Sequence, residues 1–260
     1  MERLSQRRSV TIGALASGRR DQYLWGMQPF PADPRRAGTR HVEQWVFDLD
    51  NTLYPASASL FPQIDVRMRA FIAERLGLSL DEAFRLQKRY YKEFGTTLRG
   101  LMLVNGLEPD AFLDYVHDID HTVLDLSPRL DAALAALPGR KLIFTNGTES
   151  HAEKVLARLG VGRHFEAIFD IAAAGYIPKP SPESYRLMLN RHGLAAARAA
   201  MVEDLHRNLA PAAAIGMTTV WVRQADHPDA LLTLGDDGDL SHVHHVTENL
   251  PEWLEAAASS

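Results

Sequence analysis

Short apolar runs alternate with segments of helical periodicity from Pro128 onward, and this alternation restricts the fold more than any other feature. The pattern predicts a parallel sheet with crossover helices. The runs are 142–144, 167–169, 200–202, 218–222 and a short 243–246, followed by a terminal helix near 251–256. An earlier run, 45–47, is also closed by polar residues. We therefore expect an α/β fold with a Rossmann-like, doubly wound parallel sheet.

The chain between the first strand and this region, from about 57 to 127, has a helical texture. Apolar residues recur at helical spacing from 64 to 72 until Gly77, a residue typical of a helix C-terminus. Residues 79–82 form a capping box, and a later helix follows Pro109. The expected apolar face of the helix after the capping box includes Phe84, Tyr91 and Phe94. This pattern predicts an inserted all-helical cap.

The insert divides the chain into three parts. We expect residues 41–56 and 128–256 to form the α/β core and residues 57–127 to form the helical cap. Residues 1–40 lack sustained periodicity, so we interpret them as a flexible N-terminal tail. The alternatives are a targeting segment, an ordered arm, and a start codon assigned before the true one at Met27.

Charge and composition exclude several classes of protein. Residues 1–40 hold eight arginines against three carboxylates, a charge of +5, which leaves −10 on the remaining 220 residues. An acidic body argues against binding to a nucleic acid polymer. No apolar run is long enough to span a membrane, and the lack of cysteine excludes disulfides and thiolate ligands. We expect a cytoplasmic protein and leave its oligomeric state open.

The segment DLDNTLYP at 48–55 places two aspartates one residue apart directly after the first strand. Ligands of open α/β sheets gather at the carboxyl ends of strands. Asp48 and Asp50 project the same way if the strand geometry continues, so two carboxylates share one small space. Such a pair favours a hard divalent cation such as Mg²⁺, bound together with substrate phosphate oxygens. The alternative is a solvated turn.

We expect three further polar clusters to belong to the same site as the two aspartates. They are Thr145 with Asn146, Lys179 in the segment GYIPKP, and Glu203 with Asp204. In this order the four clusters resemble the haloacid dehalogenase (HAD) superfamily of aspartate-nucleophile phosphotransferases, over about residues 44–223. The resemblance implies a HAD-type core with an inserted helical cap.

Motifs outside this set look most like the pyrimidine 5′-nucleotidase branch. They are YYKEFGTTLRGL at 90–101, YVHDIDH at 115–121 and YIPKPSPESY at 176–185. This resemblance implies a Mg²⁺-dependent phosphomonoester hydrolase, acting through an aspartyl phosphate on UMP and CMP. A phosphatase or phosphomutase for another small ester, such as a sugar phosphate or phosphoglycolate, is the alternative. A binding module without turnover is a third hypothesis.

The resemblance also implies catalytic roles. Asp48 would be the nucleophile and a metal ligand, and Asp50 the general acid and then the general base. Lys179 would neutralise charge on the nucleophile and the phosphate. Asp50, through its backbone carbonyl, and Asp204 would complete the metal ligands. Halide-displacing members of the superfamily need no acid at the position of Asp50 and no Mg²⁺, so this residue favours phosphoryl chemistry.

The remaining roles concern the phosphate and the metal surroundings. Thr145 and the amide of Asn146 would bind phosphoryl oxygens, although Thr145 could instead cap the following helix. Glu203 would lie in or just outside the metal's ligands. Many relatives have Ser or Thr and a second Asp where this chain has Leu205 and Asn208. Asn208 would either support the site through its amide or N-cap the next helix.

The insert would select the leaving group. Tyr91, Thr97 and Arg99 are the candidate substrate contacts, and Tyr90, Phe94 and Gly95 lie in the same segment. The alternative for the aromatic residues is packing within the core of the cap. Among the histidines, the best positional claims on the site belong to His117, His121, His151 and His206, with a structural role as the alternative for each.

Overall fold

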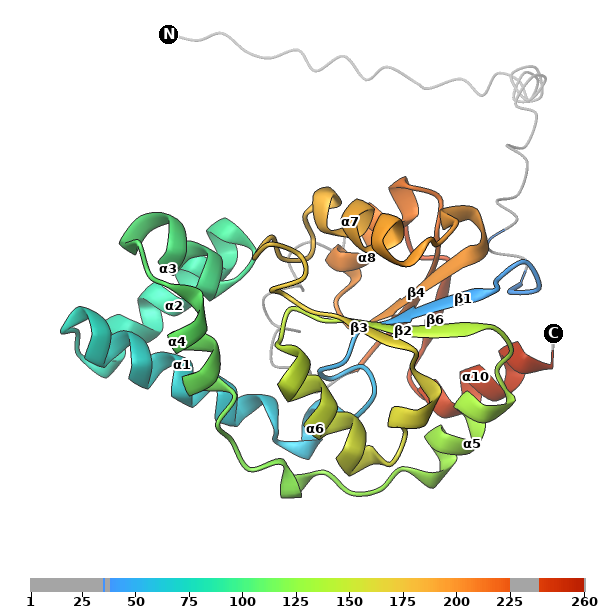
Figure 1. Ribbon diagram of the computed structural model, residues 1–260, viewed down its shortest axis with the longest axis horizontal. Helices are drawn as coiled ribbons and strands as arrows, with labels where there is room; N and C mark the ends of the chain where they lie inside the picture. Colours follow the sequence, from blue (N-terminus) through green and yellow to red (C-terminus); the bar gives the residue numbers. More distant parts are fainter. Residues whose placement is uncertain (1–34, 36–37, 225–238, 260) are drawn as a thin grey trace, which may run out of the picture. The chain divides into compact units, whose positions relative to one another are not determined.

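The predicted apolar runs form the strands of one parallel sheet (Figure 1). The computed structural model describes Arg35, residues 38–224 and residues 239–259. Within these ranges the sheet has the order β3-β2-β1-β4-β5-β6, and each neighbouring pair is parallel. The strands are β1 (Gln44–Phe47), β2 (Arg140–Phe144), β3 (Ala167–Phe169), β4 (Ala199–Glu203), β5 (Thr218–Val222) and β6 (His245–Thr247). The prediction of a doubly wound α/β fold is confirmed.

Helices cover both faces of the sheet (Figure 1). One face carries α5 (Pro128–Ala136), α6 (Glu149–Leu159) and α10 (Leu250–Ala258), and the other carries α7 (Pro182–His192) and α8 (His206–Ala214). Successive strand residues point to opposite faces, so Phe47 packs in the first of two apolar cores and Val46 in the second. Burial on both faces explains why these strands are continuously apolar.

Four helices between β1 and β2 form the helical insert: α1 (Phe61–Leu76), α2 (Leu80–Phe94), α3 (Thr97–Asn105) and α4 (Pro109–Val116). They share an apolar core of their own. Gly77 ends α1 with a left-handed backbone, and Ser79 and Glu82 form the capping box of α2, as predicted. We did not predict α3, which begins after Thr96 because the Thr96 side chain accepts the Arg99 N–H.

The predicted apolar face of α2 is partly wrong. Phe84 is 40% exposed, and the buried positions of this helix are Ala83, Gln87 and Tyr90. The buried face contains a polar residue because the side-chain amide of Gln87 donates to Asp65 at 2.8 Å. A face with glutamine at its centre does not stand out as apolar in the sequence.

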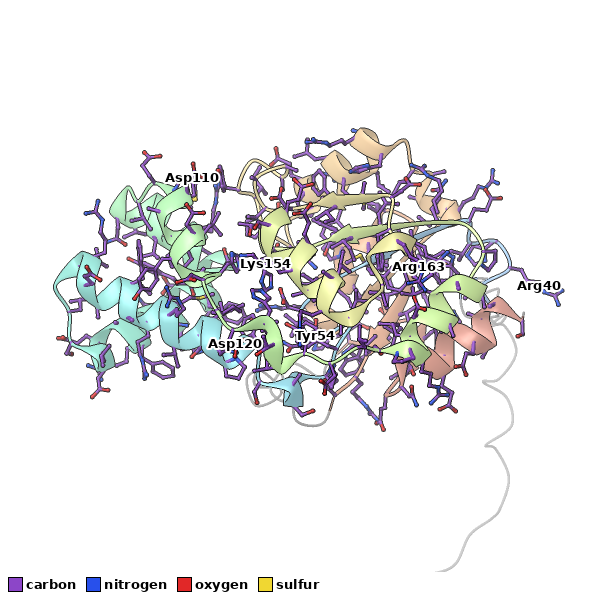
Figure 2. All side chains as sticks on the ribbon, turned by 60° about the horizontal axis from the view of Figure 1, so that its bottom comes forward. Arg40, Tyr54, Asp110, Asp120, Lys154 and Arg163 are labelled. Carbon is purple, nitrogen blue, oxygen red and sulfur yellow. The ribbon has the colours of Figure 1, made fainter. Side chains whose placement is uncertain are left out.

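Two short connections join the insert to the sheet. The chain enters through η2 (Ala56–Ala58) and returns through residues 117–127, the return segment, which contains η3 (His121–Val123). Asp120 in this segment (Figure 2) accepts the Thr122 N–H at 2.8 Å. Two further 3₁₀ turns, η4 (Gly162–His164) and η5 (Ala196–Arg198), precede β3 and β4.

The predicted division into parts is not resolved by this fold. The chain from Pro34 to Ser260 forms one compact unit, so the boundaries at 56/57 and 127/128 stay predictions. The predicted tail, residues 1–40, lies almost wholly outside the described residues. Among the helices that the structure describes, none is both long and apolar enough to cross a membrane.

Candidate active site

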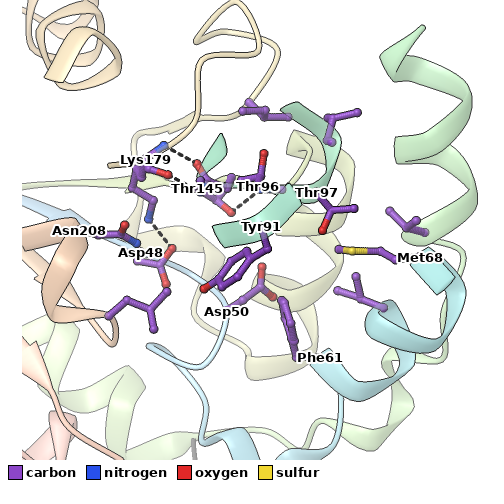
Figure 3. A pocket seen from close by; sticks show the side chains of 18 of the residues that line it. Asp48, Asp50, Phe61, Met68, Tyr91, Thr96, Thr97, Thr145, Lys179 and Asn208 are labelled. Carbon is purple, nitrogen blue, oxygen red and sulfur yellow. Dashed lines mark hydrogen bonds and ion pairs between the residues drawn. The ribbon is translucent and has the colours of Figure 1, made fainter. Parts of the chain in front are cut away.

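The carboxyl ends of three adjacent strands bring the predicted residues together. Strands β2 and β4 pair with β1 on either side, so Thr145, Asp48 and Asp204, which follow these strands, meet at one edge of the sheet. With Lys179 they line a cavity of about 150 Å³ that the insert closes on its other side (Figure 3). We call this cavity the site pocket.

Lys179 lies between two buried carboxylates. Its Nζ donates to Asp48 Oδ1 at 2.6 Å and to Glu203 Oε1 at 3.0 Å. Burial raises the pKa of Asp48 to about 7, although the Lys179 cation favours the ionised form. Burial likewise raises the pKa of Glu203 to about 7. Burial disfavours the ammonium group too, but the two carboxylates outweigh it and raise the pKa of Lys179 above its usual range.

Asn146 fixes the backbone of this lysine. Its Oδ1 accepts the Lys179 N–H at 2.8 Å, and its Nδ2 donates to the Lys179 carbonyl at 3.3 Å. The lysine Nζ also donates to the Phe144 carbonyl at 2.9 Å, at the end of β2. Both atoms of the Asn146 side-chain amide are thus bonded to the Lys179 backbone, and the phosphate contact expected of the Asn146 amide stays a prediction.

Thr52 belongs to this cluster although we did not predict it. Its Oγ1 lies 2.9 Å from Asp48 Oδ2 and 3.3 Å from Asp204 Oδ1. A hydroxyl carries one proton, so it can donate to only one of the two carboxylates at a time. The signal was present in the sequence, because threonine is the next alternate residue after the two aspartates of DLDNT.

The carboxylates of Asp48, Glu203 and Asp204 could hold a metal ion. One ligand atom from each lies within 4.8 Å of the others. Oxygen ligands of this kind suit Mg²⁺, which binds through a few carboxylates and completes its octahedral ligand set with other oxygens. The residues present therefore fit the cation that we predicted, with the side chain of Asp50 outside the group.

Glu203 and Asn208 are bonded to each other beside this group. Asn208 Nδ2 donates to Glu203 Oε1 at 2.5 Å, and the Leu205 N–H donates to Oε2 at 2.7 Å. Helix α8 begins at His206 with Leu205 as its N-cap. The alternative in which Asn208 N-caps this helix is therefore wrong, because Asn208 lies inside the first turn and uses its amide on the carboxylate.

Asp50 has a different environment from Asp48. Its Oδ1 accepts hydrogen bonds from the Tyr54 hydroxyl at 2.6 Å and from His151 Nε2 at 2.9 Å. Burial opposes ionisation of Asp50, but His151 and Tyr54 outweigh it and lower its pKa to about 2. None of the described residues bonds to Oδ2, and the side chain lines the site pocket. One oxygen is therefore held while the other faces the pocket.

Thr145 is buried and does not cap a helix. Its Oγ1 accepts the Gly147 N–H at 2.9 Å. The N-cap of α6 is Thr148, whose side chain accepts the His151 N–H at 3.2 Å. The capping alternative for Thr145 is therefore wrong, and its hydroxyl lies in the wall of the site pocket beside the carboxylates.

The insert supplies a mostly apolar wall. Tyr91 and Thr97 line the site pocket (Figure 3), whereas Arg99 lines a separate hollow with Glu183. Tyr90 packs in the core of the insert, so of the three neighbouring aromatic residues only Tyr91 reaches the pocket. The apolar lining residues from the insert are Phe61, Ile64, Met68, Leu98, Phe112, Leu113 and Val116.

Arg207 was not predicted and joins the core to this wall. It lies on α8, and its guanidinium carbon stands 4.3 Å from the centre of the Tyr91 ring. A cation over an aromatic face is attracted to it. Tyr91 is therefore braced from the core side of the pocket. No local pattern indicates this contact, because the two residues lie 116 positions apart.

Three of the four singled-out histidines gather around Asp50. The rings of His117 and His151 are stacked with centres 4.6 Å apart, and His121 Nε2 lies 3.2 Å from His151 Nδ1. The fourth, His206, packs edge-on against Trp221 at 5.4 Å between ring centres.

Comparison with known proteins now identifies the family. Residues 45–216, more than half of the chain, match the haloacid dehalogenase-like hydrolase family. The chain belongs to this family. This match confirms the predicted resemblance to the HAD superfamily, and the six-stranded parallel sheet agrees with it. Enzymes of this family generally use Mg²⁺, and the carboxylate group described above can accommodate it.

Individual relatives include phosphatases. Phosphate metabolism protein 8 of Saccharomyces cerevisiae is 30% identical over 189 residues, covering 66% of this chain and 58% of that protein. A glyceraldehyde 3-phosphate phosphatase of Methanopyrus kandleri is 28% identical over 203 residues, covering 72% of this chain and 87% of that protein. The structure of a HAD phosphatase from Thermococcus onnurineus shares the fold, with a TM-score of 0.54 at 18% identity over 83% of this chain and 97% of that one. The relative named as a phosphatase supports the prediction of a phosphatase, whereas the solved structure shows the fold alone.

Proposed function

We propose that this chain is a Mg²⁺-dependent phosphatase that hydrolyses small phosphate monoesters through an aspartyl phosphate on Asp48. We further propose that it prefers the pyrimidine nucleotides UMP and CMP. The observation that carries the mechanism is the different setting of the two aspartates. Asp48 is bonded to Lys179 within the carboxylate group, whereas Asp50 is held by Tyr54 and His151 with one oxygen facing the pocket.

In the first step, an Asp48 oxygen forms a bond to phosphorus while the bond from phosphorus to the ester oxygen breaks. Asp50 gives its proton to the departing oxygen, so the alcohol leaves neutral. Lys179, 2.6 Å from Asp48, offsets the charge that collects on the transferring group. Thr145 and the backbone N–H of Asn146 hold the phosphoryl oxygens.

In the second step, water attacks the aspartyl phosphate and the bond from phosphorus to the Asp48 oxygen breaks. Asp50, now ionised, takes the proton of the attacking water. A pKa of about 2 keeps Asp50 ionised in the resting site, but a general base works best with a pKa nearer the working pH. The acid role of Asp50 requires a higher pKa, and an anionic ester entering beside it raises the pKa in the required direction.

The metal would be held by Asp48, Asp204 and the backbone carbonyl of Asp50. Bound there, Mg²⁺ supplies positive charge that offsets the carboxylates and the phosphate of the ester. Glu203 has its oxygens bonded to Lys179, Asn208 and the Leu205 N–H. We therefore assign Glu203 to the support of Lys179.

The chemistry of the pocket supports a leaving group with an apolar face. Tyr91 lines the pocket and is braced by Arg207, so it offers a fixed surface on which a planar base can stack. Phe61 and Met68 extend the same wall (Figure 3). A pyrimidine has two apolar faces, and the sequence segments that resemble the nucleotidase branch include Tyr91.

A smaller ester is the second candidate, and the size of the pocket favours it. The cavity of about 150 Å³ lies below the range of roughly 300–1,000 Å³ usual for ligand pockets. One relative is named for its action on glyceraldehyde 3-phosphate, which is a small ester. A nucleotide therefore requires the insert to lie further from the strand ends than it does here.

Asp48→Asn tests the mechanism. We expect this variant to lose Mg²⁺-dependent hydrolysis of p-nitrophenyl phosphate, because the amide cannot form the aspartyl phosphate. Asp131→Asn, remote from the pocket and bonded to His164, is the matched control and should retain activity. Full activity in Asp48→Asn would refute the mechanism.

Phosphate release across a panel of esters tests the substrate. We expect kcat/KM for UMP and CMP to exceed that for triose and sugar phosphates. A tenfold preference in the opposite direction, about 1.4 kcal/mol in transition-state binding, would replace the nucleotide with the smaller ester.

A further inference from the structure

Two imidazole rings connect Asp50 to the return segment; the proposed function uses the bond from His151 to Asp50 but does not say what holds His151, and it gives His121 no role. His151, in the first turn of α6, is fully buried. Its Nε2 lies 2.9 Å from Asp50 Oδ1, and its Nδ1 lies 3.2 Å from His121 Nε2. The other nitrogen of His121 lies 3.1 Å from the Ile119 carbonyl oxygen. The two rings therefore stand in a row from the return segment to Asp50. Both ends of the row are oxygen acceptors, so all three hydrogen bonds form together only when the two rings share three N–H protons.

The His151 ring is fixed on its face as well as at both nitrogens. The ring of His117 stacks on it, with 4.6 Å between the centres and 16° between the planes. Thr148 Oγ1 accepts the backbone N–H of His151 at 3.2 Å and lies 3.3 Å from His117 Nδ1. A buried ring with both nitrogens bonded and one face stacked keeps a single orientation, which is what the support of a catalytic group requires.

We propose that His151 is a positioning residue for Asp50, and that His121 and His117 of the return segment hold His151 in place. His151 restrains Oδ1, so the other oxygen of Asp50 keeps its direction toward the ester oxygen and the attacking water. The inference rests on the proposed function, because it assigns His151 to the acid–base group of that reaction. It also makes the return segment part of the support of Asp50.

Removal of His151 would leave the Tyr54 hydroxyl as the remaining donor to Oδ1. A carboxylate held by one donor can rotate about that bond, and small misplacements of a catalytic group cost on the order of 100-fold in rate. The loss should depend on the leaving group. An alkoxide needs a proton as it departs, whereas p-nitrophenolate departs without one, so a misplaced acid slows the alkyl ester far more.

The test compares kcat/KM for an alkyl ester, glycerol 2-phosphate, with kcat/KM for p-nitrophenyl phosphate. This constant reports the steps up to the release of the alcohol. We expect His151→Leu to lower it by about 100-fold for the alkyl ester and by less than about tenfold for the aryl ester. His151→Gln, whose Nε2 can donate from a similar position, should recover about tenfold of the alkyl loss. His121→Leu should shift the ratio of the two constants in the same direction by a smaller factor.

A matched control separates this role from general packing. His164 also pairs with an aspartate, Asp131, at 2.7 Å between Nε2 and Oδ1, but it lies outside the site pocket. His164→Leu should leave the ratio of the two kcat/KM values unchanged. Equal losses on both esters in His151→Leu, or no loss on either, would overturn the proposal. If His151→Leu does not fold, the other two variants decide. A ratio of the two kcat/KM values equal to that of the wild type in both His121→Leu and His151→Gln would then overturn the proposal. A wild-type chain inactive toward both esters would instead refute the proposed function, and the inference with it.

Discussion

Protons and Mg²⁺ should compete for the buried carboxylates, and this competition can be measured. Burial raises the pKa of Asp48 to about 7, so the metal-free side chain is mostly neutral at pH 6 and mostly ionised at pH 8. A metal binds the ionised carboxylate, so at lower pH it must displace a proton. The ionised fraction of Asp48 differs about tenfold between these two pH values. We therefore expect the half-saturating Mg²⁺ concentration to be about tenfold higher at pH 6.

The assay is the shift in Tm on adding Mg²⁺, measured separately at each pH. A cation present at 100 times its Kd stabilises the folded state by about 2.7 kcal/mol, and at 10 times its Kd by about 1.4 kcal/mol. At about 2–4 °C per kcal/mol for a chain of this size, these energies correspond to shifts of roughly 5–10 °C and 3–6 °C. If the Mg²⁺ concentration is set at 100 times the Kd at pH 8, we expect the larger Tm shift, roughly 5–10 °C, at pH 8 and the smaller one, roughly 3–6 °C, at pH 6.

Two variants make the outcome specific. Asp48→Asn removes the titrating ligand, so its Tm shift should be small and equal at the two pH values. Asp131→Asn keeps the site intact and should behave as the wild type. Two results would refute the assignment of Asp48 as a buried ligand that takes up a proton. One is the same half-saturating Mg²⁺ concentration at pH 6 and pH 8 in the wild type. The other is a Tm shift in Asp48→Asn as large as the shift in the wild type.

Two further predictions concern Thr52 and the packing of the insert. Thr52→Val keeps the shape of the side chain but removes the hydroxyl between Asp48 and Asp204, so the half-saturating Mg²⁺ concentration should rise by about 10–100-fold; an unchanged value would show that the hydroxyl does not orient the ligands. In Gly100→Ala, the new Cβ would overlap Cβ and Cγ of Tyr90, so helices α2 and α3 must separate. We expect a loss of about 1–3 kcal/mol in the free energy of unfolding by urea, and an unchanged midpoint would contradict the close contact.

The sequence predicted the parts of the site that depend on local patterns. Asp48, Thr145 and Asp204 each follow an apolar run, and a parallel sheet brings the ends of such runs together whatever else the chain does. Lys179 could be placed by its resemblance to a known motif. The strands and the residues that follow them are therefore encoded by the local sequence at each position.

The parts that were missed depend on contacts between distant segments. The bond from His151 to Asp50 joins residues 101 positions apart, and it forms only when α6 packs under the loop after β1. The role of Asn208 depended on the residue at which α8 begins. The polar segment before this helix did not determine that residue. The buried face of α2 was missed because the Gln87 side chain donates from its amide nitrogen to Asp65, a contact that periodicity does not reveal.

The charge of the cluster shows why protons and metal must alternate there. Asp48, Glu203 and Asp204 carry three negative charges when ionised, and Lys179 is bonded directly to Asp48 and Glu203. Burial makes such an excess costly, because like charges in a low dielectric repel strongly. Burial raises the pKa of Asp48 and of Glu203 to about 7, so protons can reduce the excess near neutral pH. An anionic ester makes the excess larger, so the cluster can accept it only with a divalent cation, and substrate and Mg²⁺ should each strengthen the binding of the other.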